Sequence, residues 1–125
     1  MYTKNVDSKK FHILSFKYAF AGLVDALKEE PNLKFHFLAG LLVILLSFIL
    51  RFTRQDWITI IILIGLVISV ELTNTAIEAV VDQFVEKNHP GAKLAKDISA
   101  GAVLVAAATA AIAGVLVFLP YIFNG

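Results

Sequence analysis

The sequence predicts an all-α integral membrane protein with an N-terminal amphipathic interfacial helix and three transmembrane helices. Hydrophobic residues make up 58% of the 125 residues and charged residues only 17%, a more apolar balance than small soluble domains have. Apolar runs that approach or exceed the roughly 20 residues a spanning helix needs occur three times. The segment before them is amphipathic instead. We expect residues 1–125 to form a single domain.

The interfacial helix is expected over about residues 9–29. Phe16, Phe20, Leu23 and Leu27 recur at intervals of four, three and four, and lysines occupy the opposite face. Such a helix lies in the membrane interface with its lysines among the headgroups. A helix packed on a soluble core is the alternative, which the apolar remainder of the chain disfavours. Residues 1–8 are polar and expected to fray.

A bend should follow this helix, because Pro31 disfavours helical geometry at Glu30. The three spanning helices are expected at about 33–52, 57–84 and 96–123. A short turn joins the first two, and Trp57 suits an interfacial anchor. Residues 85–95 form a polar connection with a Pro-Gly turn. The third span is rich in alanine and glycine, which favours close helix packing, within or between subunits.

Lysines are concentrated in the N-terminal segment and near residues 85–97. They are Lys4, Lys9, Lys10, Lys17, Lys28, Lys34, Lys87, Lys93 and Lys96. The positive-inside rule therefore places the N-terminus and the second connection in the cytoplasm and the C-terminus outside. We expect no cleavable signal peptide. The absence of cysteine excludes thiolate chemistry, and no basic cluster interleaved with aromatic residues suggests a nucleic-acid partner.

The stretch from Glu71 to Asp82 places acidic groups inside or at the end of the second span. A charge near the bilayer centre costs about 2.5–3.5 kcal/mol on insertion scales, so such groups usually have a function. As a helix, the stretch puts Glu71, Asn74 or Thr75, Glu78 and Asp82 on one face. Glu71 and Glu78 lie about 10 Å apart along the axis. They suit two neighbouring tasks rather than one shared ion.

The predicted topology brings charged residues from three segments to the cytoplasmic interface. They are Glu30, Glu78, Asp82, Lys96 and Asp97. Carboxylates without cysteine or histidine clusters favour Mg²⁺, which proteins usually hold through one or two carboxylates plus substrate phosphates. No glycine-rich phosphate loop is present, so Lys96 is the candidate phosphate-facing cation. Glu71, which lies deeper, suits a base for a lipid hydroxyl.

The 71–82 stretch has Glu, then Asn three residues later, Glu seven later and Asp eleven later. In this it resembles the small bacterial lipid kinases, the diacylglycerol kinase and undecaprenol kinase family. The resemblance extends to Ala21-Gly22-Leu23, the turn at Glu30, the three spans and Ala95-Lys96-Asp97. It therefore covers nearly the whole chain.

The resemblance implies transfer of the γ-phosphate from Mg-ATP to a membrane lipid alcohol, in the bacterial inner (plasma) membrane. It also implies a homotrimer with composite sites between subunits. Glu71 would be the catalytic base, Glu30 and Glu78 would bind the metal together with ATP, and Asn74 would orient the site.

The remaining roles implied by the resemblance concern the nucleotide. Lys96 would contact phosphate, and Asp97 the sugar or base. Tyr18 and Gly22 lie where the surface helix of the family borders nucleotide and lipid. Phosphoryl transfer depends mainly on positioning and charge neutralisation, so a few carboxylates, one metal ion and one lysine can suffice.

One departure bears on the lipid substrate. Proteobacterial diacylglycerol kinases carry a Gln-Glu pair just after the first turn, where this chain has Phe35 and His36. The chain looks more like the Gram-positive type, so undecaprenol is favoured and diacylglycerol, giving phosphatidic acid, is the alternative. The roles of Asp82 and His36 stay open, with His36 interpreted as an interfacial polar residue.

Two other functional classes fit parts of the pattern. A small ion- or proton-coupled membrane protein would use Glu71 and Glu78 as a relay. A non-catalytic subunit of a helical assembly would account for the small residues of the third span. The gathering of Glu30, Lys96 and Asp97 at one interface favours the kinase over both.

Overall fold

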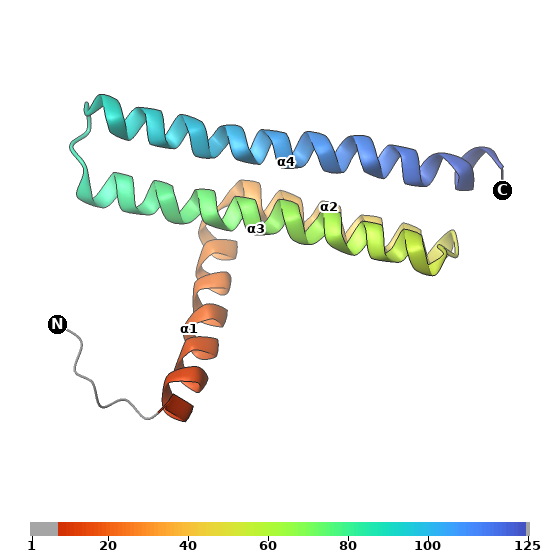
Figure 1. Ribbon diagram of the computed structural model, residues 1–125, viewed down its shortest axis with the longest axis horizontal. Coiled ribbons are helices and arrows are strands. Elements are labelled where there is room, and N and C mark those ends of the chain that lie inside the picture. The colour runs from red at the N-terminus through yellow and green to blue at the C-terminus, as the bar shows by residue number, and fades with distance from the viewer. Residues whose placement is uncertain (1–7, 125) are drawn as a thin grey trace.

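The computed structural model describes residues 8–124, and the side chains from Ser15 onward. It contains α1 (Ser8–Glu29), α2 (Pro31–Ile49), α3 (Arg54–Phe84) and α4 (Pro90–Phe123), and no strand within the described range (Figure 1). Lys4 and the side chains of Lys9 and Lys10, which entered the topology prediction, lie outside the described residues.

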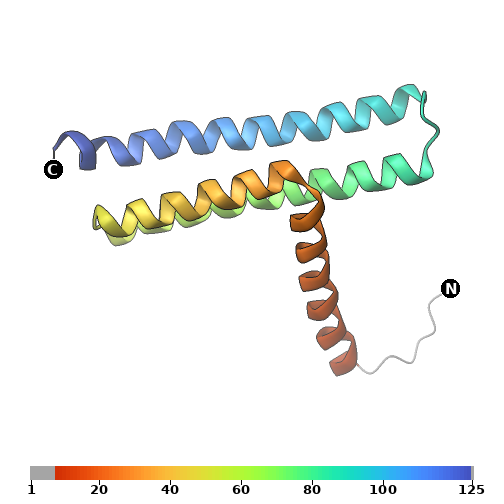
Figure 2. The same ribbon diagram turned by 180° about the vertical axis from the view of Figure 1, so that it is seen from behind.

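Helices α2, α3 and α4 are each long and apolar enough to cross a membrane. Helix α3 packs along α4, and α2 packs on α3 (Figures 1 and 2). Helix α1 leaves this bundle crosswise and exposes Phe16 and Phe20. The all-α membrane fold, with one surface helix and three spanning helices, is confirmed.

The expected bend lies at Glu30, whose backbone is extended (φ −103°, ψ 109°) directly before Pro31 at the start of α2. This corner fixes where α1 meets the bundle. Helix α2 ends at Ile49, and Arg51 in the following turn has a positive φ of 56°. The turn then closes at Thr53, whose hydroxyl accepts a hydrogen bond of 3.2 Å from the backbone nitrogen of Asp56 and so caps α3.

The connection between α3 and α4 is shorter than the sequence suggested. The imidazole Nδ1 of His89 accepts a hydrogen bond of 3.0 Å from the backbone nitrogen of Gly91, and Pro90 occupies the first helical position. Proline suits that position because it needs no backbone donor there. Helix α4 therefore begins at Pro90 rather than near residue 96, and only residues 85–89 connect the two helices.

An aromatic cluster fastens the C-terminal end of α4 to the α2–α3 turn, and we call it the aromatic clamp. Phe52 stacks on Tyr121 with ring centroids 4.4 Å apart and also contacts Phe118. The Tyr121 hydroxyl donates to Asp56 Oδ2 and accepts a hydrogen bond of 3.0 Å from the backbone nitrogen of Thr53. The three spanning helices are therefore held in register at this end.

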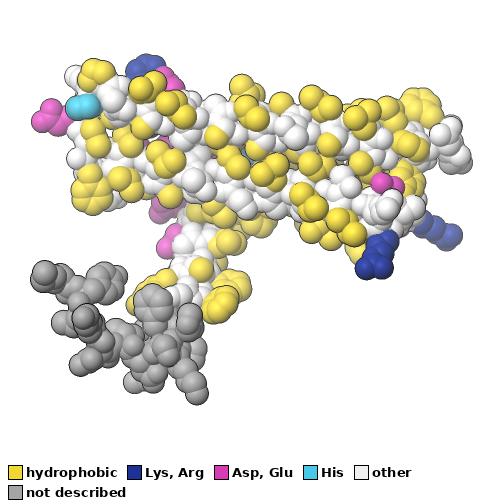
Figure 3. Space-filling model, in the orientation of Figure 1, with side chains coloured by type: hydrophobic (Ala, Val, Ile, Leu, Met, Phe, Trp, Pro, Cys, Tyr) yellow, Lys and Arg dark blue, Asp and Glu magenta, His cyan; other side chains and the backbone are white. Residues whose placement is uncertain are grey.

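Few of the described hydrophobic side chains are buried between the helices. Leu33 of α2, Ile60 and Val67 of α3, and Ala106 of α4 are buried. A Cβ atom at Gly40 would lie 3.2 Å from the Ile64 side chain, so α2 and α3 approach closely there. On the face drawn in Figure 3, charged side chains gather at both ends of the α3–α4 pair and near α1, and the surface between is apolar. This pattern is that of a bundle surrounded by lipid.

Candidate functional site

Glu71 is the most buried charged residue among the described side chains, with 2% of its surface exposed. Its Oε2 atom has no hydrogen-bond partner, and no other buried side-chain oxygen or nitrogen in the described region shares that state. The nearest basic group is His36 of α2, whose Nε2 lies 3.8 Å from Oε2. That distance exceeds a hydrogen bond, so Oε2 is buried without a hydrogen-bond partner.

Two further carboxylates influence Glu71 electrostatically. Glu78 lies two turns along α3 on the same face, and Glu30 comes from the corner between α1 and α2. The charges of both act on the Glu71 carboxyl. We call Glu30, Glu71 and Glu78 the acidic cluster. Its members repel one another, which favours binding of a cation or a group carrying one.

Asn74 lies between Glu71 and Glu78 and is also buried, with 8% exposed. Its Nδ2 donates a hydrogen bond of 3.4 Å to Glu78 Oε1, and its Oδ1 accepts one of 2.6 Å from the Ser99 hydroxyl of α4. Asn74 therefore connects Glu78 of α3 to Ser99 of α4. Ser99 was missed from sequence, although its position three residues after Lys96 places both on neighbouring parts of one helix face.

Lys96 and Asp97 lie at the first turns of α4. Lys96 Nζ pairs with Asp82 Oδ1 at 2.8 Å, and Asp97 Oδ2 pairs with Lys93 Nζ at 2.5 Å. These pairs are exposed and contribute little to stability. The charge of Glu78 also acts on Lys96, so Glu78 links the acidic cluster to this basic group.

A polar hollow of about 850 Å³ surrounds these pairs at the α3–α4 connection. The charged and imidazole side chains that line it are Asp82, Glu86, Lys87, His89, Lys93, Lys96 and Asp97. The lining of this hollow supplies both carboxylate hydrogen-bond acceptors and positively charged lysine side chains. A phosphorylated, water-soluble molecule fits this lining.

Tyr18 and Gly22, the two predicted residues of α1, are not brought to the acidic cluster. Tyr18 is 68% exposed and precedes Glu30 by twelve residues, which is about 18 Å along a helix. A Cβ atom at Gly22 would meet nothing within 4 Å. Within a single chain these residues face outward.

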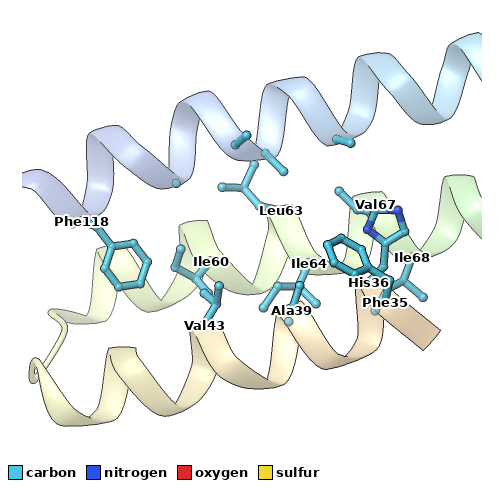
Figure 4. A pocket seen from close by; sticks show the side chains of 15 residues that line it. Phe35, His36, Ala39, Val43, Ile60, Leu63, Ile64, Val67, Ile68 and Phe118 are labelled. Atoms are coloured by element: carbon cyan, nitrogen blue, oxygen red, sulfur yellow. The ribbon is translucent and has the colours of Figure 1, made fainter. Parts of the chain in front are cut away.

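An apolar groove of about 310 Å³ runs over α3 between α2 and α4 (Figure 4). His36 and Phe35 lie at one end and Phe118 at the other, with small residues of α4 along one side. Because His36 also approaches Glu71, the groove ends beside the buried carboxylate. A lipid chain lying in it would carry its head toward the acidic cluster.

The donor set can be compared with what Mg²⁺ requires. Glu30 and Glu78 supply carboxylate oxygens, which this hard cation prefers. The described residues contain no group of three or more His, Cys, Asp or Glu side chains that could enclose a metal ion. Glu30 and Glu78 therefore suit a site in which Mg²⁺ is bound by one or two carboxylates together with the phosphates of the substrate.

Comparison with known proteins finds a family model and several relatives that match this chain. The family model described as prokaryotic diacylglycerol kinase matches residues 17–118. The chain is 43% identical over 106 residues to an undecaprenol kinase of Bacillus subtilis, covering 85% of this chain and 86% of that protein. It is 39% identical over 109 residues to a diacylglycerol kinase of Synechocystis, covering 86% and 62%. A diacylglycerol kinase of Haemophilus influenzae is 34% identical over 94 residues, covering 75% and 80%.

Proposed function

This chain belongs to the prokaryotic diacylglycerol kinase family and is a membrane-bound lipid kinase with ATP as co-substrate, and from that premise we propose that its lipid substrate is undecaprenol. The observation that carries the proposal is the apolar groove that ends at His36 beside the buried Glu71. Phe35 and His36 line its end. The relative at 43% identity acts on undecaprenol according to its name.

In the proposed reaction Glu71 is the catalytic base. It takes the proton of the lipid hydroxyl as the hydroxyl oxygen bonds to the γ-phosphorus of ATP, and the bond from that phosphorus to the bridging oxygen of ADP breaks. The products are the lipid phosphate and ADP. The burial of Glu71 beside the end of the apolar groove supports this role, because a base must reach its proton directly.

We propose that Glu30 and Glu78 hold the Mg²⁺ ion together with the phosphates of ATP. When bound, the ion neutralises the charge that develops on the phosphates during transfer. Asn74 keeps Glu78 in place through the hydrogen bond between them. Ser99 in turn fixes the orientation of Asn74.

The nucleotide is proposed to occupy the polar hollow, with Lys96 on its phosphates and Asp97 on its sugar or base. Lys96 is already within the influence of Glu78, so a phosphate between them would be shared by lysine and metal. Its present partner Asp82 is 60% exposed. This pair can therefore exchange for a phosphate contact without uncovering a buried charge.

We propose that residues 1–125 form one domain and assemble as a homotrimer with composite sites. The position of Tyr18 supports this proposal. Tyr18 lies about 18 Å from Glu30 along α1, so it would approach a nucleotide bound near Glu30 only from a neighbouring subunit. The small residues of α4 support close packing between subunits, and a Cβ atom at one of them, Gly101, would meet nothing within 4 Å in the single chain.

Replacement of Gly101 by leucine should disrupt the oligomer and leave the single chain folded. The new side chain has room within one subunit, where nothing lies within 4 Å of a Cβ atom. Sedimentation in detergent together with circular dichroism checks this. A trimer that persists unchanged would contradict an interface at this position.

The proposed orientation puts the α3–α4 connection and the N-terminus in the cytoplasm and the C-terminus outside. The lysines near residues 87–96 support it. Labelling of Lys87 in sealed vesicles of known sidedness tests it. Labelling from the outer face alone would contradict it.

The substrate proposal is tested by phosphorylation with labelled Mg-ATP in mixed micelles that contain undecaprenol or diacylglycerol. We expect kcat/KM for undecaprenol to exceed that for diacylglycerol by at least about 10-fold, the usual scale of discrimination by an apolar site. Faster formation of phosphatidic acid would favour the diacylglycerol alternative. Phosphorylation of neither lipid would contradict the proposed substrate class.

A further inference from the structure

The Glu71 carboxylate needs a group that holds it in one orientation. A general base works only when its reacting oxygen stays within hydrogen-bond reach of the proton it removes. In the described region, Asn74 donates to Glu78 and the Thr75 hydroxyl donates to the backbone oxygen of Glu71. Neither donor serves the carboxylate. Its Oε2 atom therefore remains to be satisfied.

His36 is placed to satisfy it. The imidazole comes from the second turn of α2, is 18% exposed, and has Nε2 at 3.8 Å from Glu71 Oε2. Its ring meets the Phe35 ring edge-on, with centroids 5.6 Å apart. In Figure 4 His36 lies near Val67 and Ile68 at the groove end. A movement of about 1 Å would bring the two atoms to hydrogen-bond distance.

The charges around Glu71 favour the same contact. Among the groups that act on it, Glu78 of α3 and Glu30 of the α1–α2 corner have its own sign, whereas protonated His36 has the opposite sign. The two glutamates therefore repel the Glu71 carboxylate. The imidazole is attractive whether it is protonated or simply donates from Nε2.

We propose that His36 is a positioning residue, which donates its Nε2–H to Glu71 Oε2 and leaves Oε1 to take the proton of the lipid hydroxyl. This rests on the proposed role of Glu71 as base. Catalytic hydrogen bonds often shorten only when substrate binds. Since the same ring closes the apolar groove, a lipid chain entering the groove meets the residue that orients the base.

Replacement of His36 by leucine should lower kcat about 10- to 100-fold with the KM for ATP unchanged, because misplacement of a reacting group by about 1 Å has an effect of this size. His36→Gln should retain kcat within about fivefold, because its amide donor reaches nearly as far as Nε2. His36→Asn, with a shorter reach, should behave like leucine. Ser47→Ala, a buried polar change on the same helix, is the matched control.

A double-mutant cycle separates positioning from packing. In a Glu71→Gln background, His36→Leu should produce no further loss, because the two residues act as one unit. Full kcat in His36→Leu, with Glu71→Gln inactive, would overturn the role of His36 and leave the proposed function intact. Full activity in Glu71→Gln would instead overturn the base assignment. Equal losses in the leucine, asparagine and glutamine variants would show a packing role only and overturn the inference.

Discussion

Replacement of Glu71 by glutamine is expected to lower kcat for lipid phosphorylation by about 10³-fold, within the range that general base catalysis contributes. The amide has nearly the same volume and cannot accept the lipid proton. The KM for ATP should change little, because the groups proposed to bind ATP are Glu30, Glu78, Lys96 and Asp97 rather than Glu71. Steady-state kinetics with both substrates varied checks both quantities.

The same variant should fold as well as the parent or better. Its carboxylate is buried, has no hydrogen-bond partner for Oε2 and is repelled by Glu78 and Glu30. Removing that charge removes a repulsion and a desolvation penalty. Thermal unfolding in detergent should show an unchanged or higher Tm. Asp25→Asn, which removes an exposed carboxylate on α1, is the control for activity.

Loss of activity with a large fall in Tm would contradict this account of Glu71, because it would assign the carboxylate to structure. Retained activity would contradict it more directly. The role of Glu71 as catalytic base predicts a Glu71→Gln variant that is folded and inactive.

Replacement of Glu78 by glutamine is expected to lower kcat/KM for ATP by about 10²-fold or more at low Mg²⁺. Part of this loss should be recovered as Mg²⁺ rises, since a weakened oxygen ligand is offset by mass action. Glutamine keeps an oxygen that can accept the hydrogen bond from Asn74, so the local fold is retained. A titration of activity with Mg²⁺ at fixed ATP measures the shift.

Glu30→Gln should shift the Mg²⁺ dependence in the same direction, because Glu30 is the second proposed ligand. Glu71→Gln provides the contrast, since its activity should stay low at every Mg²⁺ concentration. An unchanged Mg²⁺ midpoint in both Glu78→Gln and Glu30→Gln would contradict the proposed metal site. A shift in one alone would leave a single carboxylate ligand.

The order of the helices could be predicted from the sequence, because each helix is indicated by residues within its own segment. The repeat of Phe16, Phe20 and Leu23 marks α1, and Pro31 marks the bend. The helical period alone also puts Glu71, Asn74 and Glu78 on one face. The start of α4 was misjudged, because Pro90-Gly91 suits both a turn and a capped helix N-terminus.

The contacts between helices could not be read in this way. The bond from Ser99 to Asn74 depends on how α4 is rotated against α3. The approach of His36 to Glu71 depends on how closely α2 packs on α3, which Gly40 permits. Neither Ser99 nor His36 belongs to a sequence motif of its own helix that would predict this contact. Interhelical rotation and spacing are tertiary properties, set by packing over the whole bundle.

Family membership decides among the functional classes that the sequence left open. A relay for ions or protons would need only Glu71 and Glu78, and an assembly subunit would need neither. A match over residues 17–118 and 43% identity to an undecaprenol kinase identify the chain as a lipid kinase. The buried carboxylate is therefore part of an enzyme.

The unequal lengths of the spanning helices have a consequence for access by ATP. Helix α2 has 19 residues and α3 has 31, about 28 and 46 Å at 1.5 Å per residue, against a hydrocarbon layer of about 30 Å. Because the aromatic clamp aligns the helices at one end, the surplus of α3 and α4 extends beyond the α1–α2 corner at the other (Figure 1). We therefore expect these ends of α3 and α4 to stand outside the hydrocarbon layer. ATP would then reach the proposed nucleotide site without entering the bilayer and without a separate nucleotide-binding domain in the described chain.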